Sequence, residues 1–179
     1  MGSISRGLGC THIALTLANY LCSKLGMKTA YIELNTTNQI SALSHKTDKL
    51  SFRYKGIVFF PNTPVTALAD ILQKDYRYFI LDIGVLNMYT TTDFLRCDKS
   101  FLVCSPSKWR ASEFEEKSQK LFQNQQQNCI QLIMNLQEKE SNLTIFSKHT
   151  EALCFPYLSN PFQLEPMHFR AVSLFLKNL

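Results

Sequence analysis

The sequence predicts an α/β fold with a doubly wound, mostly parallel sheet and helices on both faces. Two observations support this prediction. Short apolar runs alternate along the chain with segments whose apolar residues recur at helical spacing. The short runs are not interrupted by polar residues, which is typical of parallel strands covered on both faces. With 179 residues, of which 45% are hydrophobic, the chain is expected to form one domain over residues 1–179.

The amino-terminal half supplies the first helix and the first strands. Ile13, Leu17 and Leu21 recur every four residues, which predicts a helix over 11–25. Strands are predicted at 28–34 (KTAYIEL), 56–60 (GIVFF) and 76–84 (YRYFILDIG), with a helix at 64–75. Only Met1 to Ile4 precede the first loop, so the first strand is predicted to be short. Either the native chain starts upstream or a short strand suffices.

The carboxyl-terminal half continues the alternation. Strands are predicted at 99–106 and 129–135, with a polar helix at 109–125 between them. Further short strands are predicted at 141–147 and 151–157, followed by a last helix at 165–179. Ligands of doubly wound sheets bind at the carboxyl ends of the strands.

The stretch GSISRGLGCTH has the glycine spacing of a phosphate-binding loop. Gly7, Gly9 and a helix beginning near Thr11 would let backbone amides and a helix N-terminus surround an anion. A Walker A loop, G-x-x-x-x-G-K-S/T, has its first glycine where this chain has Ile4 and its lysine where this chain has Cys10. A charge-assisted hydrogen bond contributes about 1.5–3 kcal/mol. Losing the lysine is therefore expected to weaken triphosphate binding by one or two decades, and to weaken transition-state stabilisation more.

Polar residues at strand ends are candidates for the chemistry of a bound phosphate. Thr11 stands where a hydroxyl would ligate Mg²⁺, and Asp82 where a Walker B carboxylate would hold Mg²⁺ or its water. Glu33 and Asn35 follow another strand and are candidates for orienting water or metal. Asn135 ends a strand and is a candidate for contacting a base edge.

Two further side chains flank the position of the missing lysine. Arg6 is a candidate bidentate donor to phosphate, and His12 is a candidate donor when protonated. The predicted nucleotide-contacting set is Arg6, Gly7, Leu8, Gly9, Cys10, Thr11, His12 and Asn135. Purely structural interpretations compete with these roles: a strand-to-helix turn for the loop, a helix cap or surface residue for Asp82, a solvated strand end for Glu33, and a turn residue for Asn135.

Cysteine spacing, apolar stretches and net charge indicate where in the cell the protein is expected. The six cysteines are widely separated and show no C-x-x-C pair or zinc-ligand spacing, which favours a reduced, cytoplasmic protein. No apolar stretch approaches about 18 residues, so no membrane span is predicted. The net charge of +5 is spread along the chain. It permits weak association with nucleic acid or with lipid headgroups but identifies no partner.

In order and spacing, these segments resemble the ParA/MinD ATPases, P-loop NTPases with a deviant Walker A motif that include TadZ/CpaE-like localisation proteins. IALTLANYL resembles the family's "iAlnLAxxLa" helix, AYIELN its "vlliDlD" strand, YRYFILDIG its "yDyiiiDtp" strand and LIMN its "vvlN" strand. The resemblance covers nearly the whole chain. It implies a P-loop NTPase-like fold, ATP or ADP with Mg²⁺ as cofactor, and Asn135 beside the adenine.

The chain departs from the family at the charged positions. Ser5 takes the place of the signature lysine, which in the family crosses to a partner subunit in an ATP-sandwiched dimer. Cys10 replaces the loop lysine, and Glu33 and Asn35 replace both aspartates of the switch strand. Asp82 is kept. The resemblance therefore implies the fold and the location of the site, but not hydrolysis.

Three functional hypotheses follow. The first is a degenerate, non-hydrolysing protein of bacterial type that binds ATP or ADP and acts in localisation or scaffolding with a protein partner or as a homodimer. It is expected in the cytoplasm, either free or peripheral at the membrane. The second is an active Mg²⁺-dependent ATPase that uses Arg6 and His12, with the ion on Thr11 and Asp82. The third is a nucleotide-free interaction module in which the loop is only a turn.

The last predicted helix, 165–179, has an apolar side that includes Phe169 and Val172. Packing of this side on the sheet is the favoured interpretation. The alternative is the amphipathic tail by which MinD-like proteins bind membranes.

Overall fold

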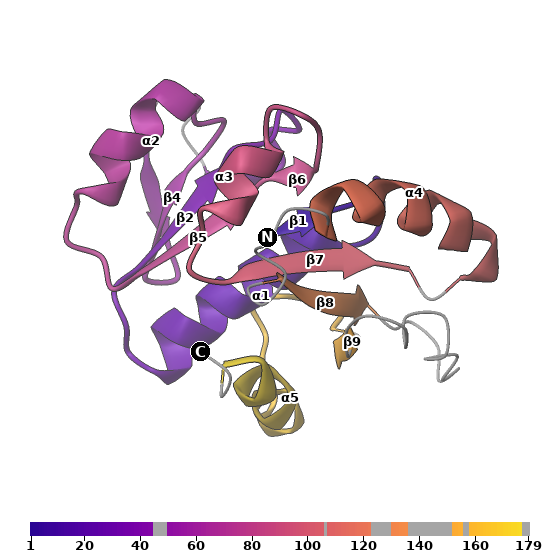
Figure 1. Cartoon of the computed structure of the whole chain (residues 1–179). Helices are drawn as coiled ribbons and strands as arrows, with labels where there is room; N and C mark the ends of the chain where they lie inside the picture. The colour runs from indigo at the N-terminus through magenta and orange to yellow at the C-terminus, as the bar shows by residue number, and fades with distance from the viewer. Residues whose placement is uncertain (45–49, 106, 123–129, 136–151, 156–157, 177–179) are drawn as a thin grey trace.

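A mostly parallel sheet runs through the protein, and helices lie on both of its faces (Figure 1). The computed structural model describes residues 1–44, 50–105, 107–122, 130–135, 152–155 and 158–176. Its strands are β1 Gly2–Ser3, β2 Thr29–Glu33, β3 Phe52–Tyr54, β4 Ile57–Phe60, β5 Tyr78–Asp82, β6 Gly84–Val85, β7 Ser100–Cys104, β8 Ile130–Asn135 and β9 Ala152–Phe155.

The strands fall into two hydrogen-bonded groups. One has the order β6-β1-β7-β8-β9 and the other β3-β4-β2-β5. All pairs are parallel except β3 with β4. The Met1 nitrogen donates to the Leu81 carbonyl at 2.8 Å, and the Ile83 amide donates to the Met1 carbonyl at 3.0 Å. The two groups are therefore joined where β5 passes into β6 alongside β1.

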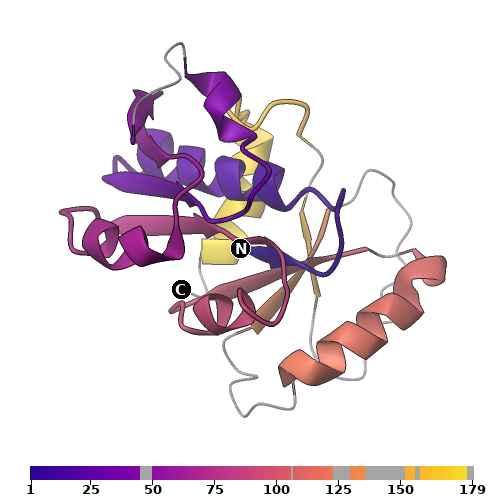
Figure 2. The same cartoon turned by 90° about the horizontal axis from the view of Figure 1, so that it is seen from above.

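The helices divide between the two faces (Figures 1 and 2). The helix α1 and the helix α5 cover one face, and α2, α3 and α4 cover the other. Their bounds are α1 Cys10–Asn19, α2 Val65–Leu72, α3 Thr91–Leu95, α4 Ala111–Phe122 and α5 Pro166–Leu176, and α1 continues as a π-helical segment, Tyr20–Lys24. Short 3-10 helices span Ile40–Leu43 and Lys108–Arg110.

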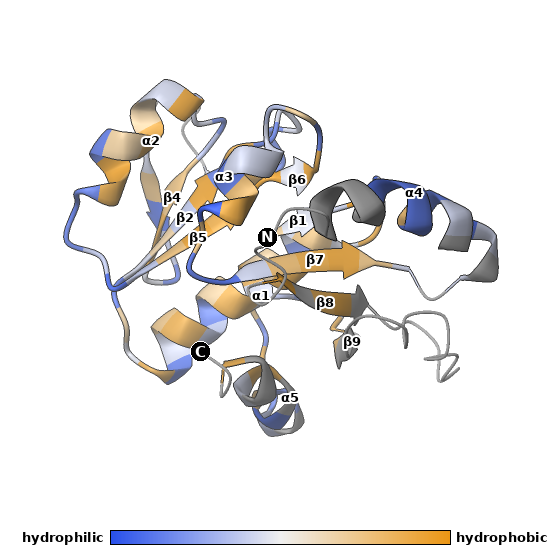
Figure 3. Ribbon diagram, viewed as in Figure 1, coloured by the Kyte–Doolittle hydropathy of each residue, from blue (hydrophilic) through white to orange (hydrophobic). Residues whose placement is uncertain are grey.

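Alternate residues of the strands pack against the helices on the two faces, in three hydrophobic clusters. Tyr31, Phe59 and Val103 pack with α1 and α5 on one face. On the other face Ala30 and Ile32 pack with α2. Burial on both faces explains why these strands are mostly apolar, and β7 is orange over most of its length in Figure 3.

The predicted elements occur with small shifts of their ends, but several elements were not predicted. The strand predicted at 76–84 divides into β5 and β6, and the 3-10 helix Ile40–Leu43 was not predicted. β3 is only three residues long, and the turn after it uses Lys55 and Gly56 with φ of 46° and 85°. Such a two-residue turn produces the antiparallel hairpin with β4. The short helix α3 was also missed. The strand predicted at 141–147 lies outside the described residues.

The last helix packs on the sheet face that α1 covers. Val172 is fully buried in this core, and the ring of Phe169 lies 6.1 Å from that of Tyr20. The Lys24 ammonium lies 4.5 Å from the centre of the Phe169 ring. These contacts support the packed interpretation of α5. Within the described residues, no helix combines the length and apolar character needed to cross a bilayer.

Candidate functional site

The loop between β1 and α1 has the backbone shape of an anion-binding turn. Gly7 and Gly9 have φ of 77° and 84°, a region that glycine adopts without strain. Gly9 is the N-cap of α1, and no side chain caps this helix end. The first amides of α1 are therefore available at the end of the helix, where its partial positive charge favours an anion.

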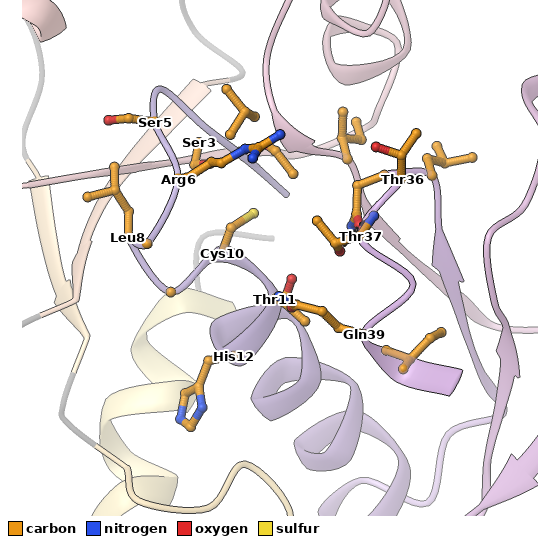
Figure 4. A pocket seen from close by; sticks show the side chains of 18 of the residues that line it. Ser3, Ser5, Arg6, Leu8, Cys10, Thr11, His12, Thr36, Thr37 and Gln39 are labelled. Carbon is orange, nitrogen blue, oxygen red and sulfur yellow. Dashed lines mark hydrogen bonds between the residues drawn. The ribbon is translucent and has the colours of Figure 1, made fainter. Parts of the chain in front are cut away.

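A cavity of about 1100 Å³ opens at the carboxyl ends of the strands. Its walls include residues 5–12 of the loop and α1, 34–37 after β2 and 83–85 after β5. Figure 4 shows Cys10 and Thr11 at the start of α1, facing this space. The volume is sufficient for a nucleotide. None of the described residues that line the cavity is Asp or Glu.

Asp82, at the end of β5, is the centre of a buried hydrogen-bonded cluster. Its side chain is 0% exposed. Oδ2 accepts the Thr11 hydroxyl at 2.7 Å and the Tyr31 hydroxyl at 2.8 Å. Oδ1 accepts the Cys10 thiol at 3.6 Å. The carboxylate that was predicted to face a metal ion is thus bound by three donors of the protein itself.

Two of these donors are held in their neutral forms. Burial raises the pKa of the Cys10 thiol, and the nearby Asp82 carboxylate raises it further. Burial also raises the pKa of the Tyr31 hydroxyl well above its usual value, again with a contribution from Asp82. Both groups therefore stay protonated at neutral pH and keep donating to Asp82. A thiol in this state is unreactive.

Glu33 ends β2, beside Asp82 in the sheet register. Its side chain is fully buried, and its carboxylate binds backbone amides. Oε1 accepts the amides of Gln39 at 2.8 Å and Ile40 at 3.4 Å, and Oε2 accepts the amide of Asn62 at 3.0 Å. Glu33 therefore ties together two loops at the rim of the sheet. Glu33 was predicted to orient water or a metal ion, and this role stays a prediction. The three amides that its carboxylate already accepts do not favour it.

Asn35 lines the cavity and fixes the chain after β2. Its Nδ2 donates to the Asp82 carbonyl at 3.2 Å, and its Oδ1 accepts the Thr37 amide at 3.0 Å. The Thr37 hydroxyl is also bonded to this oxygen. Gly84 passes close by with φ of 71°, and an added Cβ would lie 2.9 Å from the Asn35 Cβ. Glycine is therefore required where the chain leaves β5.

Arg6 and Leu8 occupy the loop beside the glycines, and both line the cavity. Arg6 is exposed, and Leu8 packs its side chain partly against the core under α1. Figure 4 shows the Arg6 side chain extending across the top of the loop. Arg6 is the single Lys or Arg side chain among the described residues of the cavity wall.

Ser5 is tied to the segment that begins α4. Its hydroxyl donates to Glu113 Oε2 and accepts from an Arg110 nitrogen, each at 3.2 Å. Lys117 donates to the Ile4 carbonyl at 3.0 Å. The Arg110 guanidinium also lies 4.6 Å from the ring centre of Trp109, which is 74% exposed. Ser5, which takes the place of the family's signature lysine, is therefore hydrogen-bonded to residues of its own chain.

His12 follows Thr11 in α1, but its ring points away from Arg6 and toward the C-terminal segment (Figure 4). Burial lowers the pKa of His12, and a hydrogen bond to the Leu158 main chain opposes this in part. Nε2 is buried and has no hydrogen-bond partner among the described residues. A neutral ring in this orientation does not favour His12 as a phosphate donor.

The lowered pKa of His12 leads to a test by pH. The unfolded chain takes up a proton at this position below its ordinary pKa of 6.5, whereas the folded chain resists protonation. The free energy of unfolding is therefore expected to fall as the pH drops below 6.5. In His12→Gln this acid-side loss should be smaller, as measured by urea unfolding between pH 7 and pH 5. His168→Gln is the control, and an equal flattening in that variant would contradict the assignment to His12.

Thr11 and Asp82 were predicted to hold Mg²⁺, and this role stays a prediction. The Thr11 hydroxyl donates to Asp82, whose carboxylate also accepts the Tyr31 hydroxyl and the Cys10 thiol. The described part of the chain contains no group of three His, Cys, Asp or Glu side chains able to hold a metal ion. Asn135 ends β8 as expected, but its side chain lies outside the described part of the structure.

Comparison with known proteins identifies the fold. No protein-family model and no curated sequence matches the chain. Solved structures do match, including a plasmid partition protein from Borrelia burgdorferi B31 bound to AMPPNP, with 14% identity, a TM-score of 0.74, and 99% of this chain and 97% of that chain covered. The chain has the ParA/MinD ATPase fold. The predicted fold class is thereby confirmed.

Two MinD structures share the ParA/MinD fold with this chain. The MinC:MinD cell division protein complex of Aquifex aeolicus matches at 14% identity and a TM-score of 0.71, covering 99% of this chain and 95% of that one. The cell division ATPase MinD of Pyrococcus furiosus matches at 11% identity and a TM-score of 0.70, covering 99% and 98%. In this ParA/MinD fold the cavity lies at the loop that the glycine spacing identified.

The sequence interpretation missed Tyr31, which completes the Asp82 cluster. The available signal was a hydroxyl-bearing aromatic residue in the middle of a buried strand, four positions before Asn35. It also missed Thr37 and Gln39, which follow β2 in the cavity wall. These residues lie in an irregular segment, and such segments carry no periodic pattern.

Proposed function

We propose that this chain is a degenerate ParA/MinD-like protein that binds ATP or ADP in the cavity without hydrolysing it, and that it acts in localisation or scaffolding. One observation carries this proposal. Cys10 stands where the loop lysine would be, and its thiol is buried against Asp82 instead of offering a positive charge to the cavity.

Nucleotide binding is supported by what the loop retains. Gly7 and Gly9 keep the left-handed backbone, and the uncapped start of α1 offers amides to an anion. Arg6 adds a positive charge to the wall. The Borrelia burgdorferi protein with this fold is bound to AMPPNP, a nucleotide analogue. The loop amides and Arg6 are therefore the groups of this cavity wall that would bind the phosphates.

The absence of hydrolysis is supported by the groups that a reaction would need. Stabilisation of a phosphoryl-transfer transition state depends on cations placed where charge develops. Arg6 is exposed, and His12 is turned away and held toward its neutral form. Glu33 and Asn35 are occupied by backbone contacts. These contacts disfavour the active ATPase that uses Arg6 and His12.

A protein partner belongs to the proposal. Aquifex aeolicus MinD forms a complex with MinC. A partner protein or a second copy of this chain is the corresponding expectation here, in the cytoplasm or peripheral at the membrane. Ser5 is bonded to α4 of its own chain, so a dimer would not use the signature-lysine contact.

Calorimetric titration with ATP and with ADP tests the proposal. We expect micromolar affinity and no phosphate release above the buffer rate. Arg6→Ala is expected to weaken ATP binding by about fivefold to thirtyfold, because it removes a charge-assisted contact from an exposed position. Arg53→Ala, an exposed arginine on β3 away from the cavity, is the matched control.

The alternative hypotheses predict different results. Sustained phosphate release that is lost in Asp82→Asn would establish an active ATPase. No binding at millimolar ATP would leave the nucleotide-free interaction module. Equal affinities for Arg6→Ala and Arg53→Ala would remove Arg6 from the binding set.

A further inference from the structure

Six exposed basic side chains gather where strands β2, β4 and β5 begin, at the opposite edge of the sheet from the cavity. The Arg77 amide donates to the Lys28 carbonyl at 2.9 Å, so the residues that precede β5 and β2 lie side by side. The Cys22 thiol donates to the Lys55 carbonyl at 3.8 Å, which places the turn between β3 and β4 against the π-helical end of α1. We call this set of side chains the basic pole: Lys24, Lys28, Arg53, Lys55, Lys74 and Arg77.

Few carboxylates offset these charges. In the described part of residues 20–80, the basic pole supplies every lysine and arginine, and the exposed acidic residues are Asp70 and Asp75. Asp75 pairs with Lys28, but this pair is open to water, with the two side chains 89% and 69% exposed. Such a pair is screened by salt and leaves the field of the other cations in place. The fold therefore concentrates at one edge a positive charge that is spread out in the sequence.

An apolar turn lies among these cations. Leu25 and Met27, on either side of Gly26, are 42% and 37% exposed. Their amides donate to carbonyls of the preceding helical turn at 3.3 and 3.0 Å, so the turn is fixed to the helix end. Lys24 and Lys28 bracket the turn in the sequence. Both exposed apolar side chains therefore lie in a cationic surface.

A cationic surface that contains an apolar turn fits an anionic membrane. Anionic headgroups attract Lys and Arg side chains, while apolar side chains enter the boundary between headgroups and acyl chains. The phosphates of a nucleic acid would also attract the cations, but they offer nothing apolar to Leu25 and Met27. The helix α5 does not compete for this role, because Phe169 and Val172 of its apolar side pack on the core.

We infer that the basic pole docks this protein on membranes that contain anionic lipids, with Leu25 and Met27 entering the headgroup region. This docking surface goes beyond the proposed function, because the pole includes no residue of the cavity wall. A protein docked in this way keeps its cavity on the side away from the bilayer. A nucleotide then has access to the cavity while the protein is on the membrane.

Sedimentation of the full chain with lipid vesicles, without nucleotide, tests this docking. One set of vesicles contains phosphatidylcholine alone, and the other contains about 30% phosphatidylserine, whose headgroup is anionic. Binding to the second set is expected to be at least about tenfold tighter, and to weaken as NaCl rises from about 0.1 M to about 0.5 M. Equal binding to both sets, or no binding to either, overturns the inference.

Charge reversals at the two edges of the sheet locate the surface. Lys55→Glu changes the pole by two charges and is expected to weaken binding to the anionic vesicles by about tenfold or more. Arg6→Glu is the matched control, because Arg6 is also exposed but lies at the other end of the strands. The five residues of β5 span about 17 Å, about twice the Debye length in physiological salt. Equal weakening in both variants would remove the pole as the docking surface.

Substitution of the apolar turn separates a membrane from a nucleic acid. Leu25→Ser combined with Met27→Ser is expected to weaken vesicle binding by about fivefold or more. Leu25→Ser alone gives the same comparison should circular dichroism show the double variant unfolded. Tighter binding to duplex DNA than to the anionic vesicles at equal salt, with no effect of the serines, would overturn docking on lipid. The ATP titration is unaffected by any of these results, so the proposed function is tested separately.

Discussion

Replacing Glu33 by alanine is expected to lower the free energy of unfolding by about 2–4 kcal/mol, because it leaves buried amides without an acceptor. The Glu33 carboxylate accepts the amides of Gln39, Ile40 and Asn62, and it is completely enclosed. Gln39 and Asn62 are exposed residues, so water can replace part of the loss at their amides. Urea unfolding, with the slope m compared between variants, measures the change.

Two variants control for this result. Glu33→Gln keeps one side-chain oxygen for two of the amides and should lose a smaller amount. Glu116→Ala removes an exposed glutamate from α4 and should leave the unfolding midpoint nearly unchanged. If Glu33→Ala unfolded at the same urea concentration as the wild type, the role of Glu33 in joining the two loops would be contradicted.

Restoring a lysine at position 10 is expected to tighten ATP binding by about tenfold to one hundred and fifty-fold, which corresponds to about 1.5–3 kcal/mol. The position opens the first turn of α1 and lines the cavity, so a longer side chain has space to reach a phosphate. Cys10→Lys should still not release phosphate, because Glu33 and Asn35 remain bonded to the backbone.

The effect of charge at position 10 is separated from that of size by Cys10→Met. Methionine has nearly the length of lysine and no charge, and it also removes the thiol bonded to Asp82. ATP affinities are compared by calorimetry in the same buffer. If Cys10→Met and Cys10→Lys bound ATP equally, the missing charge would not be what limits affinity.

The sheet and the location of the site follow from the sequence because both have local signals. Runs such as GIVFF are buried on both faces, and this burial makes them apolar throughout. Gly7 and Gly9 have positive φ, a conformation that most other residues avoid. A residue pattern of this kind is visible without knowing what lies nearby.

The chemistry around the loop is not visible in this way, because it depends on contacts between distant segments. Tyr31 reaches Asp82, 51 positions further along the chain, and nothing in the apolar strand indicates where its hydroxyl will lie. In the sequence, Glu33 stands at a strand end, where an acid could orient a metal ion. In the structure, its carboxylate instead accepts the amides of Gln39 and Asn62 from two loops. The direction of the His12 ring likewise depends on the C-terminal segment.

The contact between Trp109 and Arg110 places a tryptophan fluorophore close to the loop. Trp109 is the chain's only tryptophan, so its emission can be excited without a label. Arg110 lies over this ring and bonds Ser5 at the start of the loop. We expect a ligand that moves Ser5 to move the Arg110 guanidinium and so to change the emission of Trp109. The tryptophan therefore offers a probe of the candidate site that needs no label.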